Sequence, residues 1–292
     1  MSPAIDRRNT AWLWKVPLIA TAYFIATMIS GAMIMGLGME FPNFPGQSYN
    51  PLLSFVAALV LAGAVYLLAL GIRGSAQTRT WILFVFIYIS FCVNNQIEGV
   101  VFTTMGHADT MLVFFILPCA LIAGAAALLV GPSVESAAIE TVFSDRPASA
   151  WWWRAALAWL AFPIIYHFFG ALIYWSVADF YQGGELGLVV PSQGIILGAV
   201  TLRSLFFLLV TIPILMSWSG SRRGLMVALA AGLTAMVGVV GMIEASWLPM
   251  TMRIVHGLEI TADSIVHAWV LVALLVPRKK VSENRLSPSA AT

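Results

Sequence analysis

Charged residues are scarce in this 292-residue sequence. They make up 10% of the chain, whereas a soluble domain carries about 25%. Hydrophobic residues make up 60%, and the mean hydropathy is +0.91. The formal net charge of +2 is too small to indicate a nucleic-acid partner. This composition excludes an ordinary soluble domain and is typical of a protein that crosses a membrane several times.

Cysteine and histidine are also rare, with 2 and 4 residues respectively. Cys92 and Cys119 both fall inside apolar runs, which excludes an extracellular disulfide framework built on them. No phosphate-binding glycine loop and no catalytic serine elbow occurs in the sequence. Redox chemistry at cysteines and soluble nucleotide-dependent chemistry are therefore unsupported.

Long apolar runs are what the sequence has in abundance. A helix needs about 20 apolar residues to cross the hydrocarbon core of a bilayer, and eight runs of that kind are present. We therefore predict an all-α polytopic membrane protein with eight transmembrane helices. The predicted spans are Ala11 to Leu37, Pro51 to Ile72, Thr80 to Phe102, Thr110 to Val130, Trp151 to Val177, Gln193 to Trp218, Gly224 to Leu248, and Met250 to Val276.

Basic residues are concentrated at alternate ends of the predicted spans. Lysine and arginine favour the cytoplasmic side of a membrane, so we predict that both termini are cytoplasmic. The expected location is the plasma membrane, as a multi-pass protein of a bacterial inner membrane with lipids around it. The basic residues on this side are Arg7, Arg8, Lys15, Arg73, Arg79, Arg222, Arg223, Arg278, Lys279 and Lys280.

The two halves of the chain resemble each other when the sequence is shifted by 146 residues, which is half of 292. Pro17 then falls on Pro163, and Glu98 falls on Glu244. Matching prolines and glutamates at equivalent points of the span pattern indicate an internal duplication. Because each half has an even number of spans, we predict two parallel four-helix repeats. The predicted division is a first repeat over 1–130, a cytoplasmic linker over 131–150, a second repeat over 151–277 and a cytoplasmic tail over 278–292.

The stretch RIVHGLEITADSIVH carries five ionisable side chains inside an apolar run. At about 100° per residue, they share one helix face that is about 120° wide. A charged side chain at the centre of a membrane helix costs about 2.5–3.5 kcal/mol even on lenient scales. We therefore expect this polar stripe to face other helices or a wet cavity. The polar stripe consists of Arg253, His256, Glu259, Asp263 and His267.

Polar residues of other spans are predicted to join the polar stripe. Glu98 and Glu244 lie near the outer ends of the third and seventh predicted spans, and Asn94 lies one turn from Glu98 on the same face. His167 and Arg203 are further polar residues inside predicted spans, but their faces are not related to the stripe by sequence alone. The candidate binding residues are Asn94, Glu98, Glu244, Arg253, His256, Glu259, Asp263 and His267.

Three functions fit this cluster. Pairing between helices would make it purely structural. A divalent metal held by His256, Glu259 and Glu244 would make the protein a membrane-embedded hydrolase or lipid-modifying enzyme. A titratable stripe that runs from the outer surface past the midplane is typical of a transporter for protons, ions or small solutes. We favour the transporter, because His256 and His267 are about 16 Å apart along the helix and cannot share one compact metal centre. The oligomeric state is left open.

The charge pattern predicts which loops an impermeant thiol reagent can reach. A cysteine that replaces Glu40 is expected to react in intact cells, because the loop after the first span carries no lysine or arginine. A cysteine that replaces Ser75, between Arg73 and Arg79, is expected to react only after the membrane is permeabilised. Labelling at residue 75 in intact cells would reverse the predicted orientation.

Overall fold

The computed structural model of the chain describes residues 10–44, 46–104, 106–131, 147–182, 184 and 186–277. Within these ranges, eight helical spans are long and apolar enough to cross a membrane, and the only β-structure consists of isolated bridges. The prediction of an all-α polytopic protein with eight spans is confirmed. Arg7, Arg8, the linker residues 132–146 and the tail from Arg278 onward lie outside the described residues.

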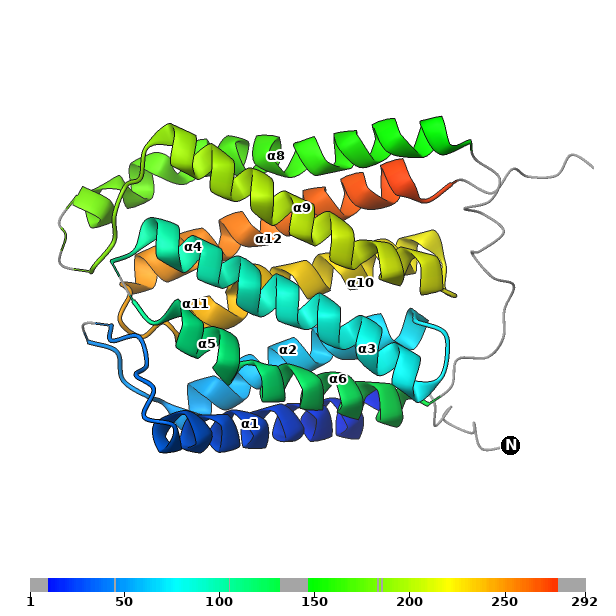
Figure 1. Cartoon of the computed structure of the whole chain (residues 1–292), viewed down its shortest axis with the longest axis horizontal. Helices are drawn as coiled ribbons and strands as arrows, with labels where there is room; N and C mark the ends of the chain where they lie inside the picture. Colours follow the sequence, from blue (N-terminus) through cyan, green and yellow to red (C-terminus); the bar gives the residue numbers. More distant parts are fainter. Residues whose placement is uncertain are drawn as a thin grey trace, which may run out of the picture.

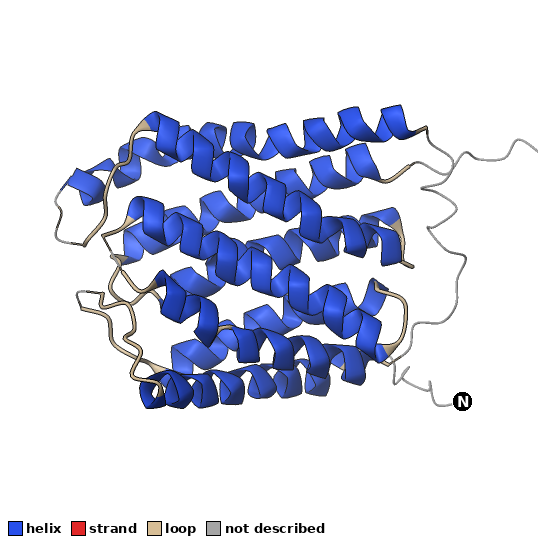
Figure 2. Ribbon diagram, viewed as in Figure 1, coloured by secondary structure: helices blue, strands red, loops and turns tan. Residues whose placement is uncertain are grey.

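The spans run side by side along the longest axis of the molecule (Figure 1), and loops join them at the two ends (Figure 2). The first four spans are formed by α1 (Trp12–Gly36), by α2 (Pro51–Gly71), by α3 (Ala76–Ile87) with η1 (Tyr88–Val93) and α4 (Asn94–Phe102), and by α5 (Ala108–Phe114) with α6 (Ile116–Val130). The last four are formed by α8 (Ala148–Gln182), by α9 (Gln193–Ser217), by α10 (Arg222–Thr234) with η2 (Ala235–Val239) and α11 (Val240–Glu244), and by α12 (Met250–Leu275).

Several helix ends differ from the predicted span limits. The third span begins at Ala76 instead of Thr80, because the Ser75 side chain accepts a hydrogen bond from the Thr78 amide and caps the helix. Helix α8 is 35 residues long and begins inside the predicted linker. The seventh span ends at Glu244 instead of Leu248, because a turn follows that residue. Hydropathy marks the apolar part of a helix, whereas capping residues set its ends.

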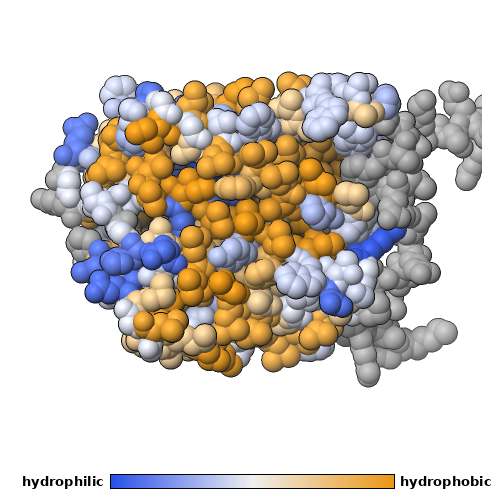
Figure 3. Space-filling model, in the orientation of Figure 1, coloured by the Kyte–Doolittle hydropathy of each residue, from blue (hydrophilic) through white to orange (hydrophobic). Residues whose placement is uncertain are grey.

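The exterior of the bundle is apolar over its middle. Figure 3 shows hydrophobic residues across the middle of one face and hydrophilic residues toward its ends. Leu172 and Trp175 of α8 are 63% and 87% exposed, and only 22% of the apolar window of α8 is buried, the smallest share of the eight spans. In a bilayer these side chains face lipid, where exposure of apolar surface carries no cost. Helix α8 is therefore the span with most contact to lipid.

Arginine side chains complete the hydrogen bonding of two helix ends. Arg154 and Arg222 each donate to a backbone carbonyl in the last turn of α12 at 3.0 Å, and Arg79 donates to the carbonyl of Gly131 beyond α6. The last carbonyls of a helix have no partner within the helix, and a cation there also interacts favourably with the helix dipole. Basic residues at this end of the bundle therefore stabilise α6 and α12.

The two halves of the chain meet along α2 and α9. Helix α2 packs against α10 and α11, and α9 packs against α3 and α4. Just beyond the C-terminal ends of α2 and α9, Ile72 and Trp218 form an antiparallel bridge, flanked by backbone hydrogen bonds of 2.9 and 2.8 Å. The third span thus packs against α6 of its own half and α9 of the second half, and the seventh span packs against α12 of its own half and α2 of the first.

π-Helical turns interrupt the third and seventh spans at η1 and η2. A π turn is rare and occurs frequently at functional sites. The Asn95 side-chain amide donates to the carbonyl of Met236 at 2.9 Å, which joins the start of α4 to η2. The segments that carry Glu98 and Glu244 both follow directly after a π turn. A search for regular helical periodicity does not detect such turns.

Gly71 lets the ring of Trp218 approach the end of α2. A Cβ atom at position 71 would lie 2.2 Å from that ring, so Gly71→Ala is expected to displace it and to lower the free energy of unfolding by about 1–3 kcal/mol. Gly63→Ala in the same helix is a matched control, because a Cβ atom there meets nothing within 4 Å. Thermal unfolding in detergent compares the two variants, and equal stability would contradict the expected clash.

Candidate functional site

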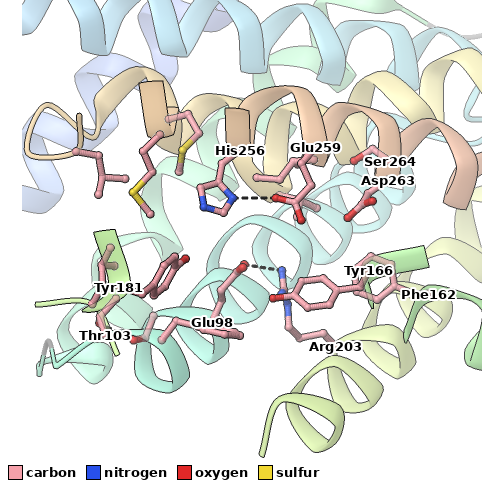
Figure 4. Close-up of a pocket in the computed structure, with 18 of the residues that line it drawn as sticks. Glu98, Thr103, Phe162, Tyr166, Tyr181, Arg203, His256, Glu259, Asp263 and Ser264 are labelled. Carbon is pink, nitrogen blue, oxygen red and sulfur yellow. Dashed lines mark hydrogen bonds and ion pairs between the residues drawn. The ribbon is translucent and has the colours of Figure 1, made fainter. Parts of the chain in front are cut away.

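A cavity of about 190 Å³ lies among the third, fifth, sixth, seventh and eighth spans. We call it the charged cavity, because charged side chains from three helices line it (Figure 4). Aromatic and aliphatic side chains make up most of the remaining wall, as in many ligand sites. The polar side chains of the lining are Glu98, Thr103, Tyr166, Tyr181, Arg203, His256, Glu259, Asp263 and Ser264.

Helix α12 supplies most of the charged lining. Its residues His256, Glu259 and Asp263 are three or four positions apart, so they lie on one face of the helix and reach the same cavity. Glu259 and Asp263 are only 9% and 6% exposed. The polar stripe therefore faces the protein interior, as its cost in lipid requires.

Two ion pairs face each other across the charged cavity. Arg203 of α9 approaches Glu98 of α4 with Nη2 and Oε2 2.7 Å apart, and His256 approaches Glu259 with Nδ1 and Oε2 2.8 Å apart. Figure 4 shows His256 and Glu259 on α12, and the other pair opposite them. Distances this short are typical of charge-assisted hydrogen bonds. The Arg203 side chain is 2% exposed, so its charge is held inside the bundle by this pairing.

Asp263 has no such partner. Within the part of the chain that the structure describes, its side chain makes neither an ion pair nor a hydrogen bond, and its Oδ1 atom is buried. Nε and Nη1 of Arg203 are also buried without hydrogen-bond partners. Buried polar atoms are almost always hydrogen-bonded in native proteins. Unpaired buried atoms that line a cavity therefore indicate a place for water or a polar ligand.

Arg253 and Glu244 lie away from the charged cavity. Arg253 donates to the carbonyls of Met242 and Ile243, each at 2.6 Å, so its guanidinium group caps the C-terminal end of α11. Glu244 lines a separate cavity of about 280 Å³, with Tyr23 of α1 and other residues of the first half. The prediction that Glu244 joins the polar stripe thus holds only for the backbone next to it, which Arg253 contacts, while the Glu244 side chain lines the second cavity.

The suggested metal ligands are divided between the two cavities. His256 and Glu259 line the charged cavity, whereas Glu244 lines the second one. Among the described residues, no group of three or more histidine, cysteine, aspartate or glutamate side chains is arranged to hold a metal ion. The geometry therefore gives no support to a divalent metal held by His256, Glu259 and Glu244.

Two further candidates lie deeper in the bundle. His267 is 1% exposed, and its ring packs against Phe162 and Phe207 with centroids 4.9 and 5.8 Å apart. Asn94 is fully buried in α4, and its side-chain amide has no hydrogen-bond partner among the described residues. Neither side chain lines the charged cavity. Of the polar stripe, only the middle residues His256, Glu259 and Asp263 therefore line the charged cavity.

A larger groove of about 530 Å³ adjoins the charged cavity. We call it the α8–α9 groove, since residues of these helices and of the loop between them form most of its wall. Tyr166, Tyr181, His256 and Glu259 line both hollows, so the groove lies directly beside the charged cavity. His167 also lines the groove, where its Nδ1 atom lies 2.7 Å from the Pro163 carbonyl.

Sequence patterns did not assign three lining residues of the charged cavity to the candidate site. Arg203 carried a signal, because an arginine within an apolar span requires an internal partner, but the identity of that partner depends on helix packing. Tyr166 and Tyr181 carried no signal, since tyrosine is common in membrane helices and at their ends. All three line the charged cavity.

No protein-family model, curated protein or solved structure matches the chain. The function is therefore inferred from the geometry of the cavities.

The ion pair of Arg203 predicts a coupled effect on stability. Arg203→Met leaves the Glu98 carboxylate near Glu259 and Asp263 without its cation, and we expect the free energy of unfolding to fall by about 3 kcal/mol. This is the lower end of the range for buried pairs, because the Glu98 side chain is 35% exposed. Adding Glu98→Gln should restore much of the loss. Thermal unfolding of both single variants and the double variant measures this coupling, and additive losses would contradict it.

Proposed function

We propose that the protein is a transporter for a proton, an ion or a small solute, and that Asp263 binds the transported cation or proton. One observation carries this proposal: a buried carboxylate without a partner lines a cavity inside a membrane-spanning bundle. Ionisable residues in such positions are costly to insert and mark the pathways of ions and substrates. A purely structural cluster would pair this group with another side chain, as it pairs Glu98 and Glu259.

The charge balance of the charged cavity favours a cation. Its lining contains the carboxyl groups of Glu98, Glu259 and Asp263, but only Arg203 and His256 as basic groups. The two ion pairs use both basic groups, so the Asp263 carboxylate remains to be neutralised. In a medium of low dielectric constant, a proton or a cation meets this need.

We also propose that the chain consists of two parallel four-helix repeats. The two residues of the bridge between halves, Ile72 and Trp218, are 146 residues apart, and so are Ser75 and Ser221, which cap α3 and α10. The π turns occupy the third and seventh spans. The packing of α2 against α10 corresponds to that of α9 against α3 under the same shift. Parallel repeats occur in transporters, where the solute site lies between them.

The proposed orientation places both termini in the cytoplasm of a bacterial cell and the protein in its inner membrane. Arg79, Arg154 and Arg222 support this orientation, since they cap helices at one end of the bundle. The charged cavity lies nearer the other end, beside Thr103 and the turn at Trp247. It would then open toward the outside.

A second candidate function is that of a membrane-embedded enzyme that modifies lipids. The observation that favours it is that the His256–Glu259 pair lines the mostly apolar α8–α9 groove as well as the charged cavity. A histidine held by a carboxylate can serve as a general base. The transporter remains our first proposal, because this reading gives no role to Asp263.

The transporter hypothesis predicts that Asp263→Asn abolishes proton flux without a large change in stability. In liposomes with a trapped pH indicator and a potassium diffusion potential, the wild type should conduct protons, and Asp263→Asn should reduce the flux to the level of empty liposomes. The melting temperature should change little, because Asp263→Asn breaks no ion pair and leaves no oppositely charged group without its partner. Glu244→Gln is the matched control, since it neutralises a carboxylate in the second cavity, and it should retain the flux. Wild-type flux in Asp263→Asn would refute the assigned role.

A further inference from the structure

The inner part of the α8–α9 groove, around Gly170, lies at the depth of the hydrocarbon core. Trp151–Trp153 and Trp175 of α8 are typical interface aromatics, and Trp153 and Trp175 are about 33 Å apart along the helix axis. This distance is close to the thickness of the hydrocarbon region, which is about 30 Å. Gly170, in the wall of the groove, lies about 7.5 Å from Trp175 toward the bilayer centre. The inner part of the groove is therefore at the depth of the lipid chains, and the residues beyond Trp175 form its outer part.

Gly170 lines the groove next to Glu259, which lines both hollows, and we call this contact the window. A Cβ atom at this position would lie 3.6 Å from Oε1 of Glu259, so the backbone of α8 passes directly over that carboxylate. Glycine destabilises the middle of a helix relative to alanine. Its presence at position 170 keeps side-chain atoms out of the space next to the Glu259 carboxylate. The groove volume of about 530 Å³ is within the range of small-molecule sites.

An aromatic residue occupies the corresponding position in the first half. Phe24 lies 146 residues before Gly170 and packs edge to face against Phe55, with ring centroids 5.8 Å apart. The Phe24 ring also lines the second cavity. Where the second half has a glycine in the wall of the groove, the first half therefore has an aromatic ring.

We propose that the α8–α9 groove takes the hydrocarbon tail of a single-chain amphiphile whose cationic amine head group binds in the charged cavity beside Asp263. The tail follows from the depth of the inner part of the groove and from the side chains that the groove shares with the cavity. The cationic head group follows from the three carboxyl groups of the cavity, of which only two have a basic partner. This inference rests on the proposed function, because it names the substrate class of the same cavity.

The test is photo-crosslinking in phosphatidylcholine liposomes with a dodecylamine that carries a diazirine at the end of its tail. Peptide mapping is expected to find adducts on groove residues such as Ala171, Tyr174 and Ile196. Excess dodecylamine should compete with the labelling, whereas butylamine, which has no long tail, and dodecanoic acid, which has an anionic head, should not. Labelling spread evenly over all lipid-facing helices, without competition by dodecylamine, would overturn the proposal.

Two variants and a control test the window itself. Gly170→Leu fills the window, and Ile196→Trp narrows the groove from α9; each is expected to reduce the labelling by about tenfold. Gly198→Leu in α9 is the matched control, because a Cβ atom there meets nothing within 4 Å, and its labelling should equal that of the wild type. Thermal unfolding checks that the variants are folded. Undiminished labelling in both folded variants would refute the window.

The outcomes separate this inference from the proposed function. Competed labelling of the groove, together with wild-type proton flux in Asp263→Asn, would leave the amphiphile site standing and remove the assigned transport role. Proton flux that depends on Asp263, without competed labelling of the groove, would leave a proton transporter and remove the amphiphile.

Discussion

The ion pair between Arg203 and Glu98 connects the two halves of the chain inside the membrane. Arg203 is 1% exposed, and its guanidinium group stays charged in proteins, so it requires an anion within the bundle. Glu98 of the third span supplies that anion at 2.7 Å. This arrangement is possible only because the third span packs against α9 of the second half. The charged cavity lies at this junction, and Glu259 and Asp263 line it together with the Arg203–Glu98 pair.

The number of spans and the direction of the polar stripe could be predicted from sequence because each depends on a single helix. Span length follows from bilayer thickness, and the shared face of Glu259 and Asp263 follows from the angular step of the α-helix. The relation between helices could not be predicted in this way. Glu98 and Glu244 occupy matching sequence positions, yet they line different cavities, because each lies on a span that packs against the opposite half of the chain.

The ends of the polar stripe show a second limit of prediction from sequence. Arg253 shares a helix face with Asp263, but it reaches the carbonyls at the end of α11, where a turn leaves backbone acceptors without partners. His267 shares the face as well, but it packs between aromatic rings. A stripe on one helix predicts that its residues face inward. The neighbouring helices decide which of them line a cavity.

The two cavities differ in what their matching positions contain. Asp263 corresponds to Leu117, Glu259 to Val113 and Gly170 to Phe24 under the shift of 146 residues. The first half therefore has apolar side chains at the positions where the second half has two carboxyl groups and a glycine in the wall of the groove. Unpaired buried groups lower stability, and proteins tolerate them where function requires them. If the halves arose by duplication, the apolar packing of one copy supports a bundle in which the other carries a strained, polar and accessible site.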